Sequence, residues 1–439
     1  MHYKKISALL FGMIMVFATQ AQNTTRSPYT MFGLGELQPI GFFNQTSMGG
    51  IGRVIREENQ FSISNPASYS ALKFAKFEYG ASAEFISQKT TTEENQYALG
   101  RFNYLALGMP LSESKNRGFS FGIIPYSNVG YDMRYAVIED SADVIYSFEG
   151  QGGLNQFYAG FGAEVFKGLS LGFNARYTFG NIKETKNKKY DQSIDLFSFV
   201  DVDDVQHRGF MFDLGVQYYG QTKKEIDYML AATFTPTSTL TTSSNRLVRT
   251  YNASGGFYID SILSVTELEG EIEIPSSLGL GFSIGKRGSW LVGAEYESTD
   301  WSNFQTADNQ NNFQMSQKYS FGGYLQFADE TDKQILKGDR FTHFVKSIRY
   351  YWGVNYNQGY LNVNGESIDQ LGISFGLGLP VMREKALPEG RIPVVSRITI
   401  GAEYVTRGTT SSDLIQEDFI RVKLGLSLSD KWFQQKKFR

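Results

Sequence analysis

The sequence predicts an all-β fold, a transmembrane antiparallel β-barrel of about 14 strands, with an N-terminal hatch inside its lumen. Three observations carry this prediction. The chain opens with an export signal, and no later apolar run reaches the roughly 18 to 20 residues of a membrane-spanning helix. Long segments alternate between apolar and polar residues. The composition is 15% aromatic, with 45 Gly and no Cys, so disulfides do not hold this exported chain together.

Residues 1–21 have the pattern of a signal peptide. Lys4 and Lys5 precede an apolar stretch from Ile6 to Ala18, and cleavage is expected after Ala21. The stretch is too short to cross a bilayer as a helix. We therefore expect export, followed by insertion as a multi-pass barrel in the cell outer membrane of a Gram-negative bacterium.

Residues 22–75 do not alternate. They contain Gly, Pro and aromatic residues in short clusters, with too little apolar periodicity for an independent core. A barrel of about 14 strands is too wide for its own side chains to fill. The segment is therefore predicted to form a hatch or plug, and the alternative is a disordered periplasmic tail.

Residues 76–428 are predicted to form the barrel. In "LSLGFNARYTFG", which starts at Leu169, apolar and polar side chains fall on opposite faces throughout, as lipid and a wet lumen require. A soluble β-sandwich also alternates, but its strands usually run about five or six residues. The predicted strands cover residues 77–90, 96–110, 117–133, 153–166, 169–184, 207–220, 225–237, 276–286, 288–302, 313–328, 343–358, 371–380, 396–407 and 418–428.

The connections between these segments differ in length. Tight turns are typical of the periplasmic end of such barrels, and long loops are typical of the outer end. Residues 429–439 are expected to form a periplasmic tail. Tight turns are predicted at 167–168, 221–224 and 286–287, long polar loops at 134–152, 185–206 and 238–275, and unusually long periplasmic turns at 329–342 and 381–395.

The sequence gives no support for an enzyme, a cofactor or a metal site. The pattern G-x-S-x-G, which marks the nucleophile elbow of hydrolases, occurs four times, but always in an alternating strand rather than at a strand-turn-helix. His207 and His343 alone remain after signal removal, and without Cys they make no zinc set. No basic block suggests nucleic acid. The four copies start at Gly118, Gly168, Gly281 and Gly372.

One stretch identifies a family resemblance. "MGGIGRVIREENQFSISNPASYSAL", residues 48–72, resembles the N-terminal segment of the FadL/OmpP1/TodX family of outer-membrane transporters, including its Asn65-Pro66-Ala67. "RGFSFGIIPYSNVGY", residues 117–131, resembles that family's third strand. The opening "SPYTMFGLGEL" and the closing residues resemble Bacteroidetes-type members. The resemblance implies passive uptake of long-chain, fatty-acid-like hydrophobic compounds, so the expected partners are such a molecule or lipid and the outer-membrane lipid itself.

Pro125 interrupts the predicted third strand, and proline is tolerated in a sheet chiefly at edges and bulges. The resemblance implies a kink here through which a ligand leaves sideways into the bilayer, whereas the alternative is an ordinary bulge near the rim. A lumen arginine could meet a ligand carboxylate. The candidate gate and ligand residues are Pro125, Asn65, Pro66, Ala67, Arg176 and Arg349.

A second function of a different class stays open. Bacteroidetes-type relatives of this family include barrel partners of secretion and assembly machines. The chain is then a non-transport barrel subunit, or a docking partner of an outer-membrane secretion or assembly complex, and its sealed barrel is a docking surface.

Overall fold

A computed structural model describes residues 25–112, 115–139, 142–190, 197–252, 258–304, 313–328, 340–387 and 390–431. The predicted signal peptide and most of the predicted C-terminal tail lie outside these ranges. None of the helices within the ranges has the length and apolarity to cross a membrane.

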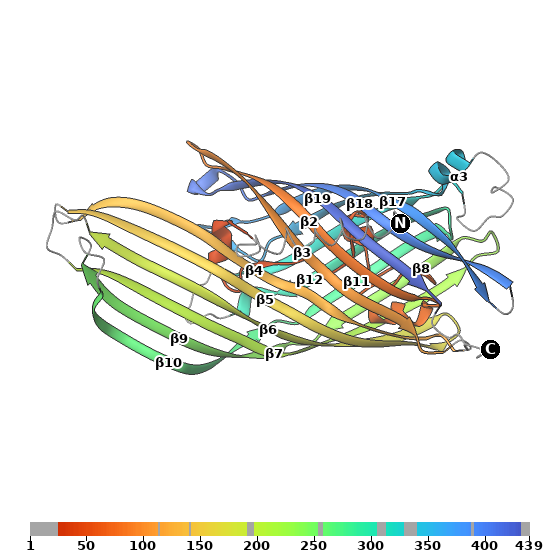
Figure 1. Cartoon of the computed structure of the whole chain (residues 1–439), viewed down its shortest axis with the longest axis horizontal. Coiled ribbons are helices and arrows are strands. Elements are labelled where there is room, and N and C mark those ends of the chain that lie inside the picture. The colour runs from red at the N-terminus through yellow and green to blue at the C-terminus, as the bar shows by residue number, and fades with distance from the viewer. Residues whose placement is uncertain are drawn as a thin grey trace, which may run out of the picture.

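Fourteen antiparallel strands close into a barrel (Figure 1). The ring runs from β2 to β8, continues with β11 to β14 and β17 to β19, and closes where β19 pairs with β2. The predicted fold class and strand number are confirmed. The strands of the ring are β2 (Ala75–Lys89), β3 (Glu94–Pro110), β4 (Arg117–Glu139), β5 (Ala142–Phe166), β6 (Leu169–Tyr190), β7 (Phe197–Gln221), β8 (Asp227–Thr235), β11 (Ser277–Lys286), β12 (Trp290–Asp300), β13 (Met315–Leu325), β14 (Arg349–Gln358), β17 (Gln370–Leu387), β18 (Gly390–Arg407) and β19 (Gln416–Asp430).

The two faces of the ring differ as the alternation predicts. On β6, Leu171 and Phe173 point outward and are exposed, whereas Ser170, Asn174 and Arg176 point inward and are buried. The same outward apolar exposure recurs on most strands of the ring. An apolar exterior on a ring of antiparallel strands suits a lipid bilayer.

The described residues of the three predicted long loops lie mostly in strands, and this part of the prediction is wrong. Six strand segments form a sheet, here called the wing, that extends beyond the ring; they cover residues 126–139, 142–154, 180–190, 197–208, 238–252 and 258–274. Figure 1 shows the wing reaching far to the left of the view. Polar residues on both faces hid these strands from a search for apolar alternation. The wing contains the outer parts of β4 to β7 together with β9 (Ser238–Asn252) and β10 (Tyr258–Ile274).

The opposite end of the barrel also departs from the prediction. The expected strand 343–358 begins only at Arg349, because α3 (Arg340–Ser347) occupies the residues before it. The expected turn 381–395 is instead a continuation of β17 and β18 as a hairpin. Short segments elsewhere are β15 (Asn362–Val363), β16 (Glu366–Ser367), η3 (Trp301–Asn303) and η5 (Ser411–Asp413).

Residues 25–74, here called the N-terminal segment, pack against inward-facing side chains of the ring. Phe42, Phe61 and Tyr69 of the segment form an aromatic cluster with Tyr104 of β3 and Tyr158 of β5. All five rings are essentially inaccessible to solvent. The segment therefore supplies a core that the ring alone lacks. Its elements are η1 (Pro28–Met31), β1 (Glu36–Leu37), α2 (Phe43–Thr46) and η2 (Pro66–Ala71).

Candidate functional site

The wall of the barrel is split between β3 and β4. The two strands pair only from Leu105 with Ile123 to Pro110 with Gly118. Beyond Leu105, residues 94–104 of β3 pair with β2 alone. The split begins level with outward-facing, exposed aromatic side chains, such as Phe102 on β3, so it opens within the apolar band.

Pro125 lies directly at this split. The register of β4 against β5 shifts between Pro125 and Ser127, which makes a β-bulge. Before the bulge the even-numbered residue Ile124 is buried, and after it the odd-numbered residues Ser127 and Val129 are buried. The set of β4 residues that faces the lumen therefore changes from even to odd numbers at the bulge. A one-residue slip turns every following side chain to the other face. Proline is tolerated chiefly at edges and bulges, and Pro125 lies at both, because the β4–β5 register shifts beside it and the pairing of β3 with β4 ends at Ile123.

Three residues of the N-terminal segment bridge the split. Glu36 and Leu37 of β1 pair with Asn128 and Ser127 of β4, and the Gln38 N–H donates to the carbonyl of Tyr126 at 2.8 Å. Side chains of the same segment reach β3: Arg101 donates to Glu36 at 3.1 Å and to Gln38 at 3.2 Å. The backbone thus holds one side of the split and the side chains hold the other.

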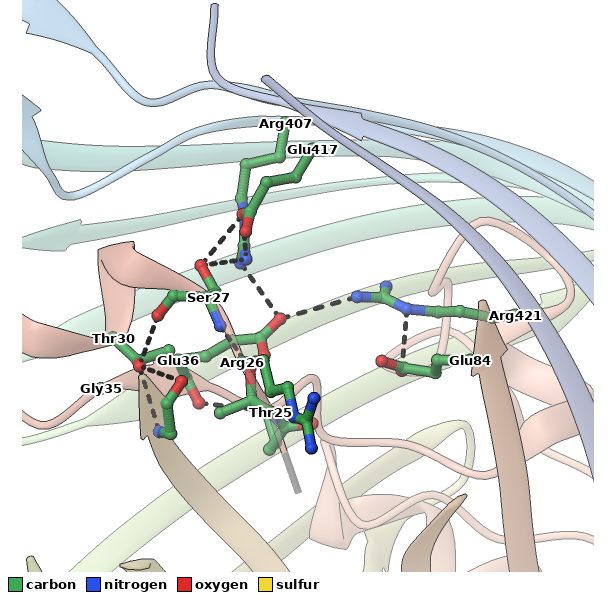
Figure 2. Close-up of polar contacts among 12 residues, drawn as sticks. Thr25, Arg26, Ser27, Thr30, Gly35, Glu36, Glu84, Arg407, Glu417 and Arg421 are labelled. Atoms are coloured by element: carbon green, nitrogen blue, oxygen red, sulfur yellow. Dashed lines mark hydrogen bonds and ion pairs between the residues drawn. The ribbon is translucent and has the colours of Figure 1, made fainter. Parts of the chain in front are cut away.

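Glu36 is the centre of a charged cluster that spans both ends of the ring. Its carboxylate accepts from Arg407 at 3.1 Å and lies 3.6 Å from Arg421. Figure 2 shows these two arginines of β18 and β19 converging on Glu36 from the wall. The cluster, here called the Glu36 cluster, consists of Glu36, Glu84, Arg101, Arg407, Glu417 and Arg421.

The charges of the Glu36 cluster balance, since three carboxylates meet three guanidinium groups. Burial is the largest influence on Glu36 and acts to raise its pKa, but Arg101, Arg407 and Arg421 together outweigh it and lower the pKa to about 2. Glu36 is therefore ionised at neutral pH. Breaking such a buried pair from one side leaves an uncompensated charge, which costs on the order of 3 kcal/mol.

A cavity of about 320 Å³ lies behind the bridge. Its lining combines apolar residues near the split, such as Leu37, Ile40 and Tyr126, with charged side chains. Lys318 among them forms no ion pair with any described residue. The charged lining residues are Glu36, Arg53, Arg176, Asp213, Glu297, Lys318, Glu403, Arg407, Arg421 and Lys423.

Two further residues of the N-terminal segment, Arg53 and Glu57, form ion pairs with other parts of the wall. Arg53 binds Glu295 of β12 at 3.1 Å and also Glu297. Glu57 binds Arg349 of β14 at 2.8 Å. Together with Glu36, these contacts hold the segment at three separate places around the ring.

Comparison with known proteins identifies the family of this chain. The model of the BamG family matches residues 2–439. The chain belongs to the BamG family. No curated protein sequence matches it.

Solved structures share the fold of this BamG-family chain at low sequence identity. The CymD monoaromatic hydrocarbon channel is 14% identical with a TM-score of 0.54, covering 92% of this chain and 99% of that chain. A Pseudomonas aeruginosa FadL homologue is 13% identical with a TM-score of 0.55, covering 91% and 100%. The P. putida toluene transporter TodX is 15% identical with a TM-score of 0.55, covering 92% and 100%. The predicted FadL/TodX resemblance thus holds for the fold, while the matching family model is BamG.

Asn65-Pro66-Ala67 of this BamG-family chain starts η2 and lies against the wall. The Asn65 side chain accepts from the Ala67 N–H at 3.1 Å and donates to the carbonyls of Arg53 and Val216 at 3.2 and 3.1 Å. The three residues are fully buried. They anchor the N-terminal segment and do not line the cavity.

Four glycines in register make room for η2. Each pairs with the next across β4 to β7, and a Cβ on any of them would collide with η2 or with Asn65 before it. Two of these glycines belong to G-x-S-x-G patterns, and all four serines of those patterns lie inside strands. Ser170 accepts from Ser70 at 2.9 Å, and Ser374 accepts from the Gly49 N–H at 3.0 Å. The row, here called the glycine row, is Gly118, Gly162, Gly172 and Gly215.

The structure separates the two predicted ligand arginines of this BamG-family barrel. Arg176 lines the cavity, but its guanidinium binds Asp213 and donates to Gln156 at 3.2 Å. Arg349 lies outside the cavity lining and holds Glu57 and Gln326. Their roles toward a ligand stay a prediction.

The sequence analysis did not identify Glu36 or its partner Arg101 as candidate site residues. Both carry a signal that was readable: Arg101 is a charge on the lumen face of an alternating strand, and Glu36 is an acid in a segment expected to lie inside the barrel. Their pairing was not readable, because the partners Arg407 and Arg421 lie more than 300 positions further along the chain.

Proposed function

We propose that the chain is an outer-membrane channel for passive uptake of long-chain, fatty-acid-like hydrophobic compounds, which leave the lumen sideways at the split between β3 and β4. The observation that carries the proposal is the coincidence of three features at one place. The pairing of β3 with β4 ends there, Pro125 bulges there, and the cavity is lined there by Leu37 and Ile40.

The lining of the cavity supports an amphiphile with an acidic end. An apolar body fits against Leu37, Ile40 and Tyr126, next to the opening toward lipid. The acidic end then meets the ammonium group of Lys318. Among the charged side chains that line the cavity, Lys318 is the one that forms no ion pair with a described residue. Ligand pockets combine mostly apolar walls with a few placed polar groups in this way.

In this proposal residues 36–38 act as the latch of a hatch formed by the N-terminal segment. They close the split in the structure, so passage requires them to leave β4. The other side of the segment stays fixed through the glycine row and the Arg53 and Glu57 ion pairs. A local movement of the latch then opens the wall without release of the whole segment.

A cross-link between Leu37→Cys and Ser127→Cys tests the latch. The two residues are direct partners in the ladder, at a separation that a disulfide can bridge, and the chain has no other Cys. We expect uptake of a fluorescent fatty acid to fall at least about tenfold on oxidation and to return on reduction.

The matched control is a disulfide between Thr239→Cys and Glu273→Cys, which are partners in the wing away from the split. It should leave uptake unchanged. Pro125→Val is the second variant, since it removes the bulge-forming residue. Full uptake by the oxidised Leu37–Ser127 protein, or by a folded Pro125→Val protein, contradicts lateral exit.

A second candidate is a non-transport barrel that serves as a subunit or docking partner of an outer-membrane assembly or secretion complex. The observation that favours it is the threefold ionic attachment of the N-terminal segment, which suits a permanently sealed barrel. Pull-down with lipid extraction and mass spectrometry separates the two functions. Co-purified lipid supports uptake, and a partner complex at fixed stoichiometry supports docking.

A further inference from the structure

The wing is an open sheet with two edges, and the described part of the chain covers only one of them. At the β4 edge, β1 pairs with Asn128 and Ser127, and the Gly130 N–H and carbonyl both bond to the Thr30 hydroxyl at 3.1 Å. The N-terminal segment therefore serves as an added strand on that side.

The other edge is β10, which pairs with β9 alone among the described residues. It runs for 17 residues, and all of them except Val265, Ile272 and Ile274 are exposed. A strand at the edge of a sheet presents a row of unpaired N–H and carbonyl groups that can template another strand. Proteins usually shorten, bulge, charge or cover such edges. The register of β10 against β9 shifts at three places, but residues 268–274 pair with β9 without a shift and form the regular part of the edge.

The side chains of β10 define what could pair with it. Glu269, Glu271 and Glu273 face their partners Ser243, Thr241 and Thr239 on one side of the sheet. None of the three carboxylates forms an ion pair with a described residue. The alternate positions are Leu268, Gly270 and Ile272, and the Leu268 side chain is 61% exposed. One face of the edge is acidic and the other is apolar.

We propose that the free edge of β10 is a docking site for an extended segment of a partner protein, which adds to the wing as a further strand and alternates Lys or Arg with apolar residues. Main-chain bonds supply affinity in this mode of recognition, and alternate side chains supply specificity. The basic residues meet the glutamate row, and the apolar residues cover Leu268. Opposite charges across neighbouring strands stabilise the pairing.

A second copy of this chain does not fit the same edge. Pairing β10 with itself on the acidic face sets glutamate rows side by side, and like charges across a strand pair destabilise it. The proposal does not depend on whether the lumen conducts, because the wing lies beyond the ring.

The test uses the full chain in detergent and a labelled seven-residue peptide, acetyl-Lys-Val-Lys-Val-Lys-Val-Lys-amide. A peptide of the same sequence with every backbone amide N-methylated keeps the charge but cannot add as a strand. We expect the first to bind at least about tenfold more tightly than the second. Equal binding of the two peptides, or no binding of either, overturns the proposal.

A charge-reversed pair of variants locates the site. Glu269→Lys combined with Glu271→Lys should weaken peptide binding by about tenfold or more. The matched control, Glu93→Lys with Glu366→Lys, changes the same charge at other polar positions at this end of the barrel and should stay within about twofold of wild type. Both changes lie on side chains without buried contacts, so the fold is retained. An equal loss in the two variants, or wild-type dimers that depend on Glu269, overturns the proposal.

Discussion

Glu36 ties the latch to three strands of the wall, since its carboxylate joins guanidinium groups on β3, β18 and β19. Its removal therefore has a local and predictable effect. The backbone of the latch is held on β4 by few hydrogen bonds, and the ion pairs supply the remaining attachment. Substitution of Glu36 should loosen residues 36–38 without unfolding the ring.

The first prediction is that Glu36→Gln lowers the hydrogen-exchange protection of the amides of residues 36–38. A loss on the order of 3 kcal/mol corresponds to roughly 100-fold faster exchange. The control is Glu297→Gln, which breaks an Arg53 ion pair elsewhere in the segment. Unchanged protection in Glu36→Gln, or an equal loss in the control, would contradict the assignment of the latch.

The second prediction concerns pH. The pKa of Glu36 is lowered to about 2 from its usual value of 4.5, so its contribution is complete above about pH 4.5 and is lost as the pH falls toward 2. A spin label on Leu37→Cys should become mobile over that window. The same label in a Glu36→Gln background should be mobile already at neutral pH. A label that stays immobile at about pH 2 in the wild-type background counts against this linkage.

At the scale of elements, the glycine row shows why η2 can lie against the wall. Four neighbouring strands each carry a glycine at the same level of the wall. Asn65, Pro66 and Tyr69 fill the space that side chains would otherwise occupy there. The sequence analysis singled out Asn65-Pro66-Ala67 through a resemblance, and two of the four glycines, Gly118 and Gly172, through a catalytic pattern. Only the strand register connects the two, since it places Gly118, Gly162, Gly172 and Gly215 in one line.

The third prediction is that Gly172→Val displaces η2, because the new side chain collides with Pro66. Overpacking of this kind costs about 1–3 kcal/mol, which should appear as a lower thermal transition and faster proteolysis near residue 66. Ala175→Val on the same strand points outward and should change neither measurement. An unaltered transition in Gly172→Val would mean that the segment can move away at no cost.

At the scale of the whole molecule, the ring and the N-terminal segment are separable. The ring closes through β19 and β2, which pair from Asp430 with Ala75 to Gln416 with Lys89. The backbone ladder of that closure contains no residue of the segment. A barrel of 14 strands leaves a lumen that its own side chains do not fill, so the segment decides how much of the lumen is open.

The fourth prediction is that a chain without residues 25–74 still folds as a barrel but conducts ions. In planar bilayers we expect large, steady single-channel currents from the deletion and little current from the complete chain. Folding is checked first by the heat-dependent shift in gel mobility that intact barrels show. Equal currents from the two folded proteins would show that the segment does not block the lumen.

The sequence by itself determined the alternating strands, their number in the ring and the presence of a non-alternating segment before them. These features are local, because the two-residue period of a strand and the polarity of its two faces can be read along a short stretch. The same reasoning failed for the wing, where neither face is buried against lipid and the alternation fades. It also placed a strand over α3, whose apolar residues gave no contrary signal.

Only the tertiary structure decided which lumen charges pair, where the wall splits and which sheet edge stays uncovered. Each depends on contacts between distant parts of the chain, as when Glu36 meets Arg407, 371 positions away. Strand register fixes these contacts, and a shift of one residue exchanges the inward and outward faces. Pro125 was visible in the sequence, but the end of β3 pairing beside it was not.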